Sequence, residues 1–321
     1  MRAMQVTAYD QPLCMRELDM PTPGAGQVLV QIATCGLNFG DLLLIKGTYQ
    51  EKPPLPFTLG MELAGTVVGV GPGVSNLKTG QRIASYTGFD GLAEYAVINA
   101  DICVPIPDQM GAVDAAAFLI AYGTSHVGLN YKAHLQPGER LLVLGASGGV
   151  GLTAVELGKL MGAEVIACAR GADKLAVCKA AGADHLINSE TDDIREVVKS
   201  LGGADVVYDP VGGDQFKAAM RACNPEARLL PLGFASGEVP QIPANILLVK
   251  NLSVLGFYWG GYARVNPSVL TDSFKQLFVW YIEGKLKPHV SHVLPLDQAN
   301  EALELLRTRK ATGKVVVQVA D

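Results

Sequence analysis

A glycine-rich turn between two apolar segments constrains the fold of this chain more than any other feature. The apolar run at 141–144 leads into Gly145-Ala146-Ser147-Gly148-Gly149-Val150-Gly151, and further apolar residues follow. Glycines at this spacing permit a tight turn, and they let N–H groups at a helix N-terminus approach a pyrophosphate. The spacing differs by one residue from strict G-x-G-x-x-G, so a purely structural turn is the alternative. We expect the residues against the pyrophosphate to be Ala146, Ser147, Gly148, Gly149, Val150 and Gly151.

The segments around this turn alternate between apolar strands and helices. Such alternation predicts an α/β domain with a doubly wound parallel sheet, because parallel strands need a crossover helix between them. We expect strands at 140–144, 164–168, 185–187, 204–208, 228–232 and 252–257, with helices at 150–161, 173–181 and 192–201.

The two ends of the chain have a different pattern. Residues 1–110 contain short alternating β runs broken by Gly and Pro, which predicts a small barrel-like β domain. The tail resumes this style and closes with a strand at 314–319. We therefore predict a catalytic domain built from 1–122 and 259–321, with the dinucleotide-binding domain inserted at 123–258.

Composition excludes several classes of protein. Lys and Arg number 26 against 31 Asp and Glu, and this acidic balance disfavours nucleic-acid binding. The longest apolar run, at 115–122, has eight residues, whereas a membrane span needs about 20. Six scattered cysteines and the lack of a signal-peptide pattern favour reduced thiols and a cytoplasmic protein.

The end of the second predicted strand indicates which dinucleotide is bound. Proteins that prefer NAD place an acid there for the ribose 2′-hydroxyl, whereas this chain has Arg170 followed by Lys174. Both cations can pair with a 2′-phosphate, so we predict NADPH as the cofactor. The alternative is that both are solvated surface charges.

Five motifs together are similar to one known family. They are Cys-Gly-Leu-Asn-Phe-Gly-Asp at 35–41, Gly-Met-Glu-Leu-Ala-Gly at 60–65, the turn at 145–151, Tyr-Asp-Pro-Val-Gly-Gly at 208–213 and Ala-Thr-Gly-Lys at 311–314. Over its full length the chain resembles the zinc-independent branch of the medium-chain dehydrogenase/reductases, specifically NADPH:quinone oxidoreductase-like proteins. The resemblance implies a GroES-like catalytic domain, a Rossmann domain that binds NADPH, and a homodimer.

The resemblance also indicates whether the protein binds a zinc ion. Zinc-dependent relatives place ligands at the positions that here hold Asn38, Met61 and a residue near Ile120. An amide, a thioether and an aliphatic side chain do not make a zinc site, so we expect no metal.

Chemistry without a Lewis acid favours substrates that are already electrophilic, namely quinones and α,β-unsaturated carbonyls. Tyr49 matches a tyrosine that lines the site in these relatives, although Leu43 replaces a second one. We take Tyr49 and Asn38 as catalytic candidates: Tyr49 as a hydrogen-bond donor, and Asn38 either as a donor to substrate or as a group orienting the nicotinamide ribose. Asp41 is expected to cap the following helix rather than to transfer a proton.

Further cofactor contacts are expected outside the carboxyl ends of the strands and in the closing loop. The residues concerned are Thr124, Gly233, Phe234, Phe257, Tyr258 and Lys314. The leading hypothesis is an NADPH-dependent oxidoreductase acting on quinones or other conjugated carbonyls. The alternatives are an enoyl or enone reductase, including one for acyl-thioesters, and a non-catalytic NADPH-binding protein of the crystallin-like or RNA-binding kind.

Overall fold

The computed structural model describes residues 1–320, which form two compact units. The first, here called the β unit, comprises Met1–Ile120 and Pro288–Asp321; the second, the α/β unit, comprises Ala121–Lys287. Among residues 1–320, no helix combines the length and the apolar character needed to cross a membrane.

The β unit contains two sheets. A three-stranded sheet has the order β2-β1-β4, and a seven-stranded sheet has the order β15-β16-β3-β5-β6-β8, with β7 paired to β3. The strands are β1 (Arg2–Val6), β2 (Cys14–Glu17), β3 (Gln27–Leu37), β4 (Phe57–Thr58), β5 (Glu62–Val70), β6 (Arg82–Ser85), β7 (Tyr95–Asn99), β8 (Cys103–Pro105), β15 (Val290–Pro295) and β16 (Lys314–Gln318). Its helical segments are α1 (Phe39–Ile45), η1 (Ala100–Ile102), α2 (Ala112–Ala116), η4 (Leu296–Gln298) and α11 (Ala299–Arg307).

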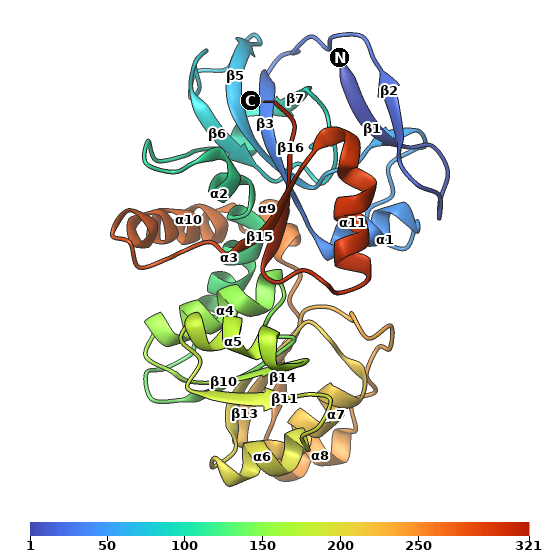
Figure 1. Ribbon diagram of the computed structural model, residues 1–321. Coiled ribbons are helices and arrows are strands. Elements are labelled where there is room, and N and C mark those ends of the chain that lie inside the picture. The colour runs from blue at the N-terminus through green and yellow to red at the C-terminus, as the bar shows by residue number, and fades with distance from the viewer. Residues whose placement is uncertain (321) are drawn as a thin grey trace. The chain divides into compact units, whose positions relative to one another are not determined.

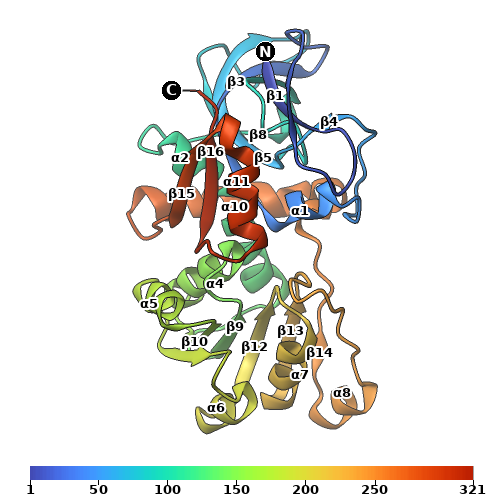
Figure 2. The same cartoon turned by 45° about the vertical axis from the view of Figure 1, so that its right-hand side comes forward.

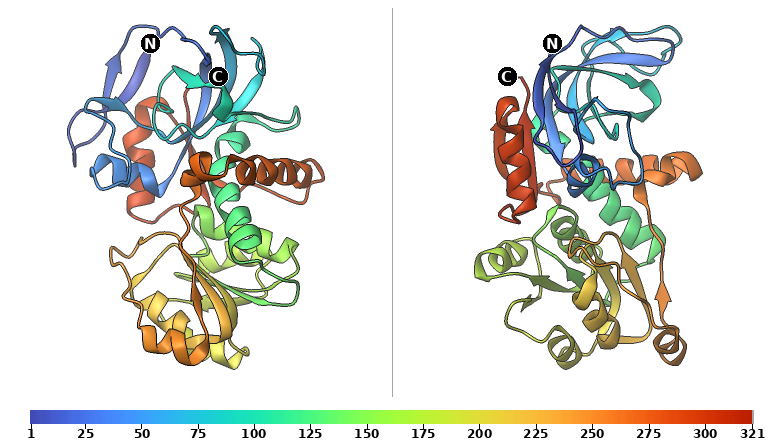
Figure 3. Two further views of the ribbon diagram at one scale, coloured as in Figure 1. Left: turned by 180° about the vertical axis from the view of Figure 1, so that it is seen from behind. Right: turned by 90° about the vertical axis from the view of Figure 1, so that its right-hand side faces the viewer.

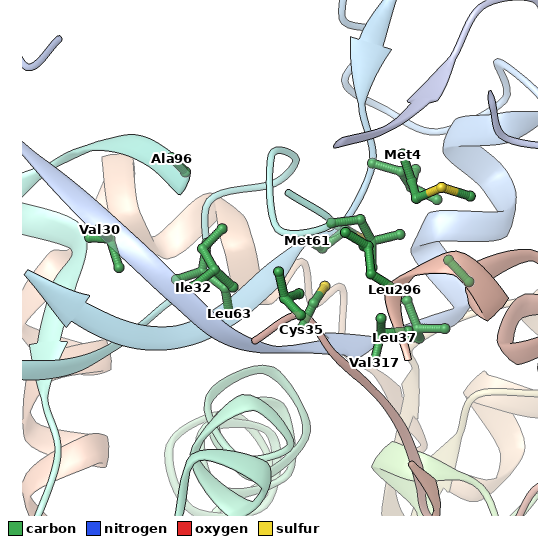
Figure 4. Close-up of a cluster of buried hydrophobic side chains, with 14 of the residues drawn as sticks. Met4, Val30, Ile32, Cys35, Leu37, Met61, Leu63, Ala96, Leu296 and Val317 are labelled. Carbon is green, nitrogen blue, oxygen red and sulfur yellow. The ribbon is translucent and has the colours of Figure 1, made fainter. Parts of the chain in front are cut away.

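Backbone pairing explains why both ends of the chain build one unit. β16 pairs antiparallel with the second half of β3, so that Val316 lies opposite Gly36. Figures 2 and 3 show the C-terminal strand and α11, in red, beside the N-terminal segments in blue. The apolar core crosses the same junction: Figure 4 shows Leu37 and Val317 next to each other, and Cys35 is also buried in this core.

The α/β unit contains a six-stranded parallel sheet of order β11-β10-β9-β12-β13-β14. Its strands are β9 (Arg140–Leu144), β10 (Glu164–Ala169), β11 (His185–Asn188), β12 (Ala204–Asp209), β13 (Cys223–Pro231) and β14 (Ser253–Val254). Figure 1 shows α4 (Gly149–Leu160) and α5 (Ala172–Ala180) on one face, with α6 (Ile194–Ser200), α7 (Gly213–Ala222) and α8 (Ala244–Lys250) on the other. This is the doubly wound arrangement predicted from the sequence.

The second boundary lies later than the expected 258/259. Helix α10 (Pro267–Ile282) packs on η2 (Val127–Lys132), the π-helical turn that follows α3 (Leu119–His126). The buried His126 Nδ1 lies 2.8 Å from the Ser273 hydroxyl, and the ring of His126 meets Trp280 edge-on. Residues 259–287, which include η3 (Trp259–Gly261) and α9 (Tyr262–Val265), therefore group with the α/β unit.

Both ends of the α/β unit are fixed to one side chain of α4. The Tyr122 hydroxyl donates to Glu156 Oε2 at 2.6 Å, and the Lys287 N–H donates to Glu156 Oε1 at 2.8 Å. Burial raises the pKa of Glu156, and these two hydrogen bonds oppose the rise. One carboxylate thus holds the segments where the chain enters and leaves this unit.

Candidate functional site

The glycine turn lies between the end of β9 and the start of α4. Gly145 has a φ of 57°, a backbone conformation that glycine adopts without steric cost. A Cβ added to Gly151 would lie 2.3 Å from the Gly145 carbonyl oxygen. Gly151 is therefore required for the helix to begin this close to the strand.

The first turn of α4 provides the groups that suit a pyrophosphate. The N–H groups of Ala146 and Gly148, expected to face the pyrophosphate, are already used: Ala146 donates to the Cys168 carbonyl on β10, and Gly148 donates to the Gly145 carbonyl within the turn. The N–H groups of the first helical turn, which begins at Gly149, have no intrahelical acceptor, and they carry the positive end of the helix dipole. The turn predicted from the sequence thus has the geometry of an anion site at a helix N-terminus.

Ser125, the neighbour of Thr124, holds α3 against the first turn of α4. The buried Ser125 hydroxyl donates to the Val150 carbonyl at 2.9 Å and lies 2.7 Å from the hydroxyl of Thr153. A third contact, at 2.9 Å, joins Ser125 to the buried hydroxyl of Tyr208 on β12. Thr124 itself is half-buried and lies in α3, close to the start of the α/β unit.

The loops after β12 and β13 lie side by side at the carboxyl end of the sheet. Asp209 Oδ1 accepts the N–H groups of Val211 and Gly212 at 2.7 and 2.9 Å, and burial raises the pKa of this carboxyl group to about 6. The Ala235 N–H donates to the Pro210 carbonyl at 3.1 Å. These bonds position Gly233 and the exposed Phe234 at this edge, where the sequence predicted cofactor contacts.

Phe257 and Tyr258 differ in their surroundings. The Phe257 ring lies against Gly128, where an added Cβ would be 3.2 Å away, and its centroid is 6.0 Å from that of Tyr262. Tyr258 is exposed. Phe257 is therefore packed against other residues of the unit, whereas Tyr258 is accessible to solvent.

The two cations expected to bind a 2′-phosphate follow β10: Arg170 comes directly after the strand, and Lys174 lies on α5. Arg170 Nε lies 3.6 Å from Glu190 Oε1, and both side chains are about half exposed. The adjacent Gly171 N–H donates to Asn188 Oδ1 at 3.1 Å, which fixes the start of α5. Lys174 is half-buried on α5. Arg170 is thus accessible, with an exposed carboxylate as its partner.

A buried polar cluster in the β unit joins residues that lie far apart in the sequence. Lys314 Nζ donates to Asn38 Oδ1 at 2.7 Å and also to Glu62 Oε1. Asn38 Nδ2 donates to Glu62 Oε1 at 3.0 Å and to the Gly36 carbonyl at 3.2 Å. The side chains of Lys314 and Glu62 are only 5% and 1% exposed, so this is an ion pair inside the unit. The charge of Lys314, predicted to face the cofactor, is already compensated by Glu62.

Glu62 is the functional candidate that the sequence analysis missed. Its Oε2 accepts the Ile120 N–H at 3.0 Å, so one carboxylate connects β5 with β3, β16 and the start of α3. The signal in the sequence is an acid among the apolar residues of 59–64, because a buried charge requires a partner.

Tyr49 lies near the same end of β3. A Cβ added to Gly40 would lie 2.5 Å from Met61 Sδ and 3.4 Å from Tyr49 Cε2, which places both side chains over the start of α1. Tyr49 is half-buried against the core of the β unit. Tyr49 and Asn38, the two catalytic candidates, thus both lie near the start of α1.

Asp41 caps α1, as predicted. Its Oδ2 accepts the Asn38 backbone N–H at 2.8 Å, while the buried Oδ1 has no hydrogen-bond partner. Burial raises the pKa of Asp41 to about 7, against the lowering effects of that hydrogen bond and of Lys314.

Residues 1–320 contain no group of three or more His, Cys, Asp and Glu side chains that could hold a metal ion.

Comparison with known proteins identifies the class. The family model for the alcohol dehydrogenase GroES-like domain matches residues 24–108, within the β unit, and the model described as zinc-binding dehydrogenase matches residues 149–275, within the α/β unit. The two units thus have the domain composition of a medium-chain dehydrogenase/reductase.

Relatives over the whole length specify the branch. The chain is 41% identical to the quinone oxidoreductase-like protein 2 homolog of Nematostella vectensis, over 98% of this chain and 88% of the relative. It is 36% identical to quinone oxidoreductase-like protein 2 of Mus musculus, over 99% of this chain and 92% of the relative. Quinone oxidoreductase of Escherichia coli, solved in complex with NADPH, is 28% identical, with a TM-score of 0.94 over 99% of this chain and 100% of that one. The chain belongs to the zinc-independent, quinone oxidoreductase-like family, as the motifs predicted.

Because the Asp41 carboxyl group is buried and its pKa is raised, we expect the stability of the fold to depend on pH. A folded-state pKa of about 7 means that Asp41 stays protonated in the fold while the unfolded chain ionises near 4. The fold therefore loses stability relative to Asp41→Asn as the pH rises from about 4 to 7, by up to ~4 kcal/mol, and no further above 7. Urea unfolding of both proteins between pH 4 and 8 measures the difference.

The exposed Asp297→Asn variant is the control for this comparison. A stability difference between wild type and Asp41→Asn that stays constant from pH 4 to 8 would contradict the prediction.

Proposed function

We propose that this chain is an NADPH-dependent oxidoreductase that reduces quinones or other conjugated carbonyls without a metal ion. Membership of the quinone oxidoreductase-like family supports oxidoreductase activity, and structures of relatives solved with NADPH support that cofactor. The observation that carries the proposal is the turn at 145–151, which leaves the first-turn N–H groups of α4 without intrahelical acceptors and leaves no room for a side chain at Gly151.

Residues of the α/β unit would hold the cofactor. The first-turn N–H groups of α4 face the pyrophosphate, and Arg170 pairs with the 2′-phosphate after release from Glu190. Thr124 and the loop at Gly233 lie at the carboxyl end of the sheet, where ligands of such folds bind. When bound, NADPH supplies the hydride.

Residues of the β unit would act on the acceptor. A conjugated carbonyl gains negative charge on oxygen as it accepts a hydride, and a hydrogen-bond donor at that oxygen lowers the barrier. Tyr49 carries a hydroxyl suited to this role and is held against Gly40 and Met61. The side chains at the zinc-ligand positions are not metal ligands, so the electrophilicity has to come from the conjugation of the substrate itself.

Turnover with labelled cofactor tests the proposal. With NADPH deuterated at the transferable position, quinones should be reduced to hydroquinones, and the deuterium should be lost to water because it ends on oxygen. An enone product that retains deuterium on its β-carbon, without quinone turnover, would support the enone reductase instead. Binding of NADPH without turnover on any acceptor would contradict oxidoreductase function and favour a non-catalytic role.

Cofactor preference follows from Arg170. Removing this cation in Arg170→Ala should weaken NADPH binding by about 10- to 100-fold, as expected for a charge-assisted hydrogen bond, and change NADH binding little. Dissociation constants from the fluorescence of the bound nicotinamide measure both. Arg195→Ala, which removes an exposed arginine of α6, is the matched control. Equal losses for the two cofactors in Arg170→Ala would refute the assignment.

We also propose that two copies associate through the β14 edge of the parallel sheet. β14 has a neighbour on one side only, and the adjacent α8 exposes Leu248 and Val249 at 77% and 73%. An open strand edge beside exposed apolar side chains is suited to pairing with a second copy. Sedimentation should show a dimer that Leu248→Asp/Val249→Asp converts to monomer; a wild-type monomer would contradict this.

A further inference from the structure

Three buried hydroxyl groups of the α/β unit meet at the start of α4. They belong to Ser125 on α3, Thr153 on α4 and Tyr208 on β12. Ser125 Oγ lies 2.7 Å from Thr153 Oγ1 and 2.9 Å from the Tyr208 hydroxyl oxygen, and it donates to the Val150 carbonyl at 2.9 Å. Burial of a hydroxyl group costs free energy unless the group is hydrogen-bonded, so these three side chains depend on one another.

The direction of donation follows from the hydroxyl of Tyr208. Among residues 1–320, its hydrogen-bond partner is Ser125, so the hydrogen of the tyrosine hydroxyl is donated to Ser125 Oγ. The hydrogen of Ser125 then needs an acceptor, and the Val150 carbonyl can only accept. Donation thus runs from β12 through α3 to a carbonyl in the first turn of α4.

This carbonyl belongs to a peptide unit whose other end is part of the candidate anion site. The Val150 carbonyl and the Gly151 N–H lie on one planar trans peptide and point in opposite directions. The first intrahelical bond of α4 joins the Leu152 N–H to the Gly148 carbonyl, so the Gly151 N–H has no intrahelical acceptor. A hydroxyl bonded to the carbonyl fixes the peptide plane, and by polarising the peptide it makes the N–H a stronger donor.

The glycine turn itself offers little to hold this peptide. Gly148, Gly149 and Gly151 have no side chains, and glycine has more backbone freedom than any other residue. The Thr153 hydroxyl lies 3.1 Å from the Val150 carbonyl, but such a bond within one helix is common and is not evidence of a special role. Ser125 comes from a different helix, so its bond to Val150 is the anchor that carries the argument.

We propose that Ser125 and Tyr208 are positioning residues that hold the peptide between Val150 and Gly151 as a donor to the cofactor pyrophosphate. Ser125 bonds the peptide directly, and Tyr208 orients the Ser125 hydroxyl. Neither side chain touches a phosphate, because both act through this peptide. The inference rests on the pyrophosphate site proposed above at the N-terminus of α4, and it extends that site to α3 and β12.

Paired substitutions separate this role from a purely structural one. Ser125→Ala/Tyr208→Phe removes both hydroxyl groups, so neither is left without a partner and the fold should stay stable. Ser125→Ala alone leaves the buried Tyr208 hydroxyl unpaired and should lower the stability measured by urea unfolding. The matched control is Ser273→Ala, which removes a buried hydroxyl bonded to His126, the next residue of α3.

Two ligands report on different parts of the cofactor site. NADPH carries the pyrophosphate, whereas adenosine 2′-monophosphate carries the adenine and the 2′-phosphate without it. The folded double variant should bind NADPH about fivefold more weakly, the size of one neutral hydrogen bond, and should bind adenosine 2′-monophosphate as the wild type does. Ser273→Ala should keep both dissociation constants, which titration calorimetry measures.

Three results would overturn the inference. They are wild-type affinity for NADPH in the folded double variant, an equal loss of affinity for the two ligands, and the same selective loss in Ser273→Ala. Should the double variant not fold, Ser125→Cys replaces it under the same criteria, because the thiol still accepts from Tyr208 but is only a weak donor to Val150.

The experiment also distinguishes failure of the inference from failure of the proposed function. Wild-type turnover together with an unaffected double variant overturns the positioning role and leaves the activity standing. Absence of turnover on every acceptor overturns the activity, and the dissociation constants, which need no acceptor, still decide the positioning role. A wild type that does not bind NADPH would overturn both.

Discussion

The ammonium group of Lys314 is buried at the start of β16, and the β unit has to provide partners for its charge. A charge removed from water is tolerated only with a charged partner and hydrogen bonds, and Glu62 and Asn38 supply them. Because these residues come from β16, β5 and the start of α1, their bonds connect the C-terminal strand to the N-terminal half of the unit. The same bonds fix the orientation of the Asn38 amide.

The cluster also involves the positions at which the family resemblance places zinc ligands in the zinc-dependent relatives. Of the three positions that hold ligands in those relatives, Asn38 and Ile120 here contact Glu62 through the side-chain amide and the backbone N–H. Met61 packs over Gly40 instead. One carboxylate, that of Glu62, thus holds two of these three positions.

Local features of the fold were predictable, and long-range ones were not. The strand at 140–144 matches β9 because an apolar run and a glycine turn are contiguous signals. The strand expected at 252–257 shortens to Ser253–Val254, since an edge strand pairs on one side only. Lys314 was predicted to lie in the closing cofactor loop, but its buried partner Glu62, 252 residues away in the sequence, lies beyond the reach of any local pattern. Asn38 could be named as a candidate from the sequence, but the orientation of its amide depends on Glu62 and Lys314, which lie far away in the sequence, as well as on the nearby Gly36 carbonyl.

The most direct test is hydrogen exchange at the Asn38 side chain, followed by NMR on protein labelled with ¹⁵N-asparagine. Both Nδ2 protons should be resolved and should exchange slowly in the absence of any ligand, because each is donated to a fixed acceptor. In Glu62→Gln/Lys314→Met they should exchange faster. Exchange in the wild type as rapid as that of the exposed Asn245 would show that the amide is free to rotate, and it would contradict the account.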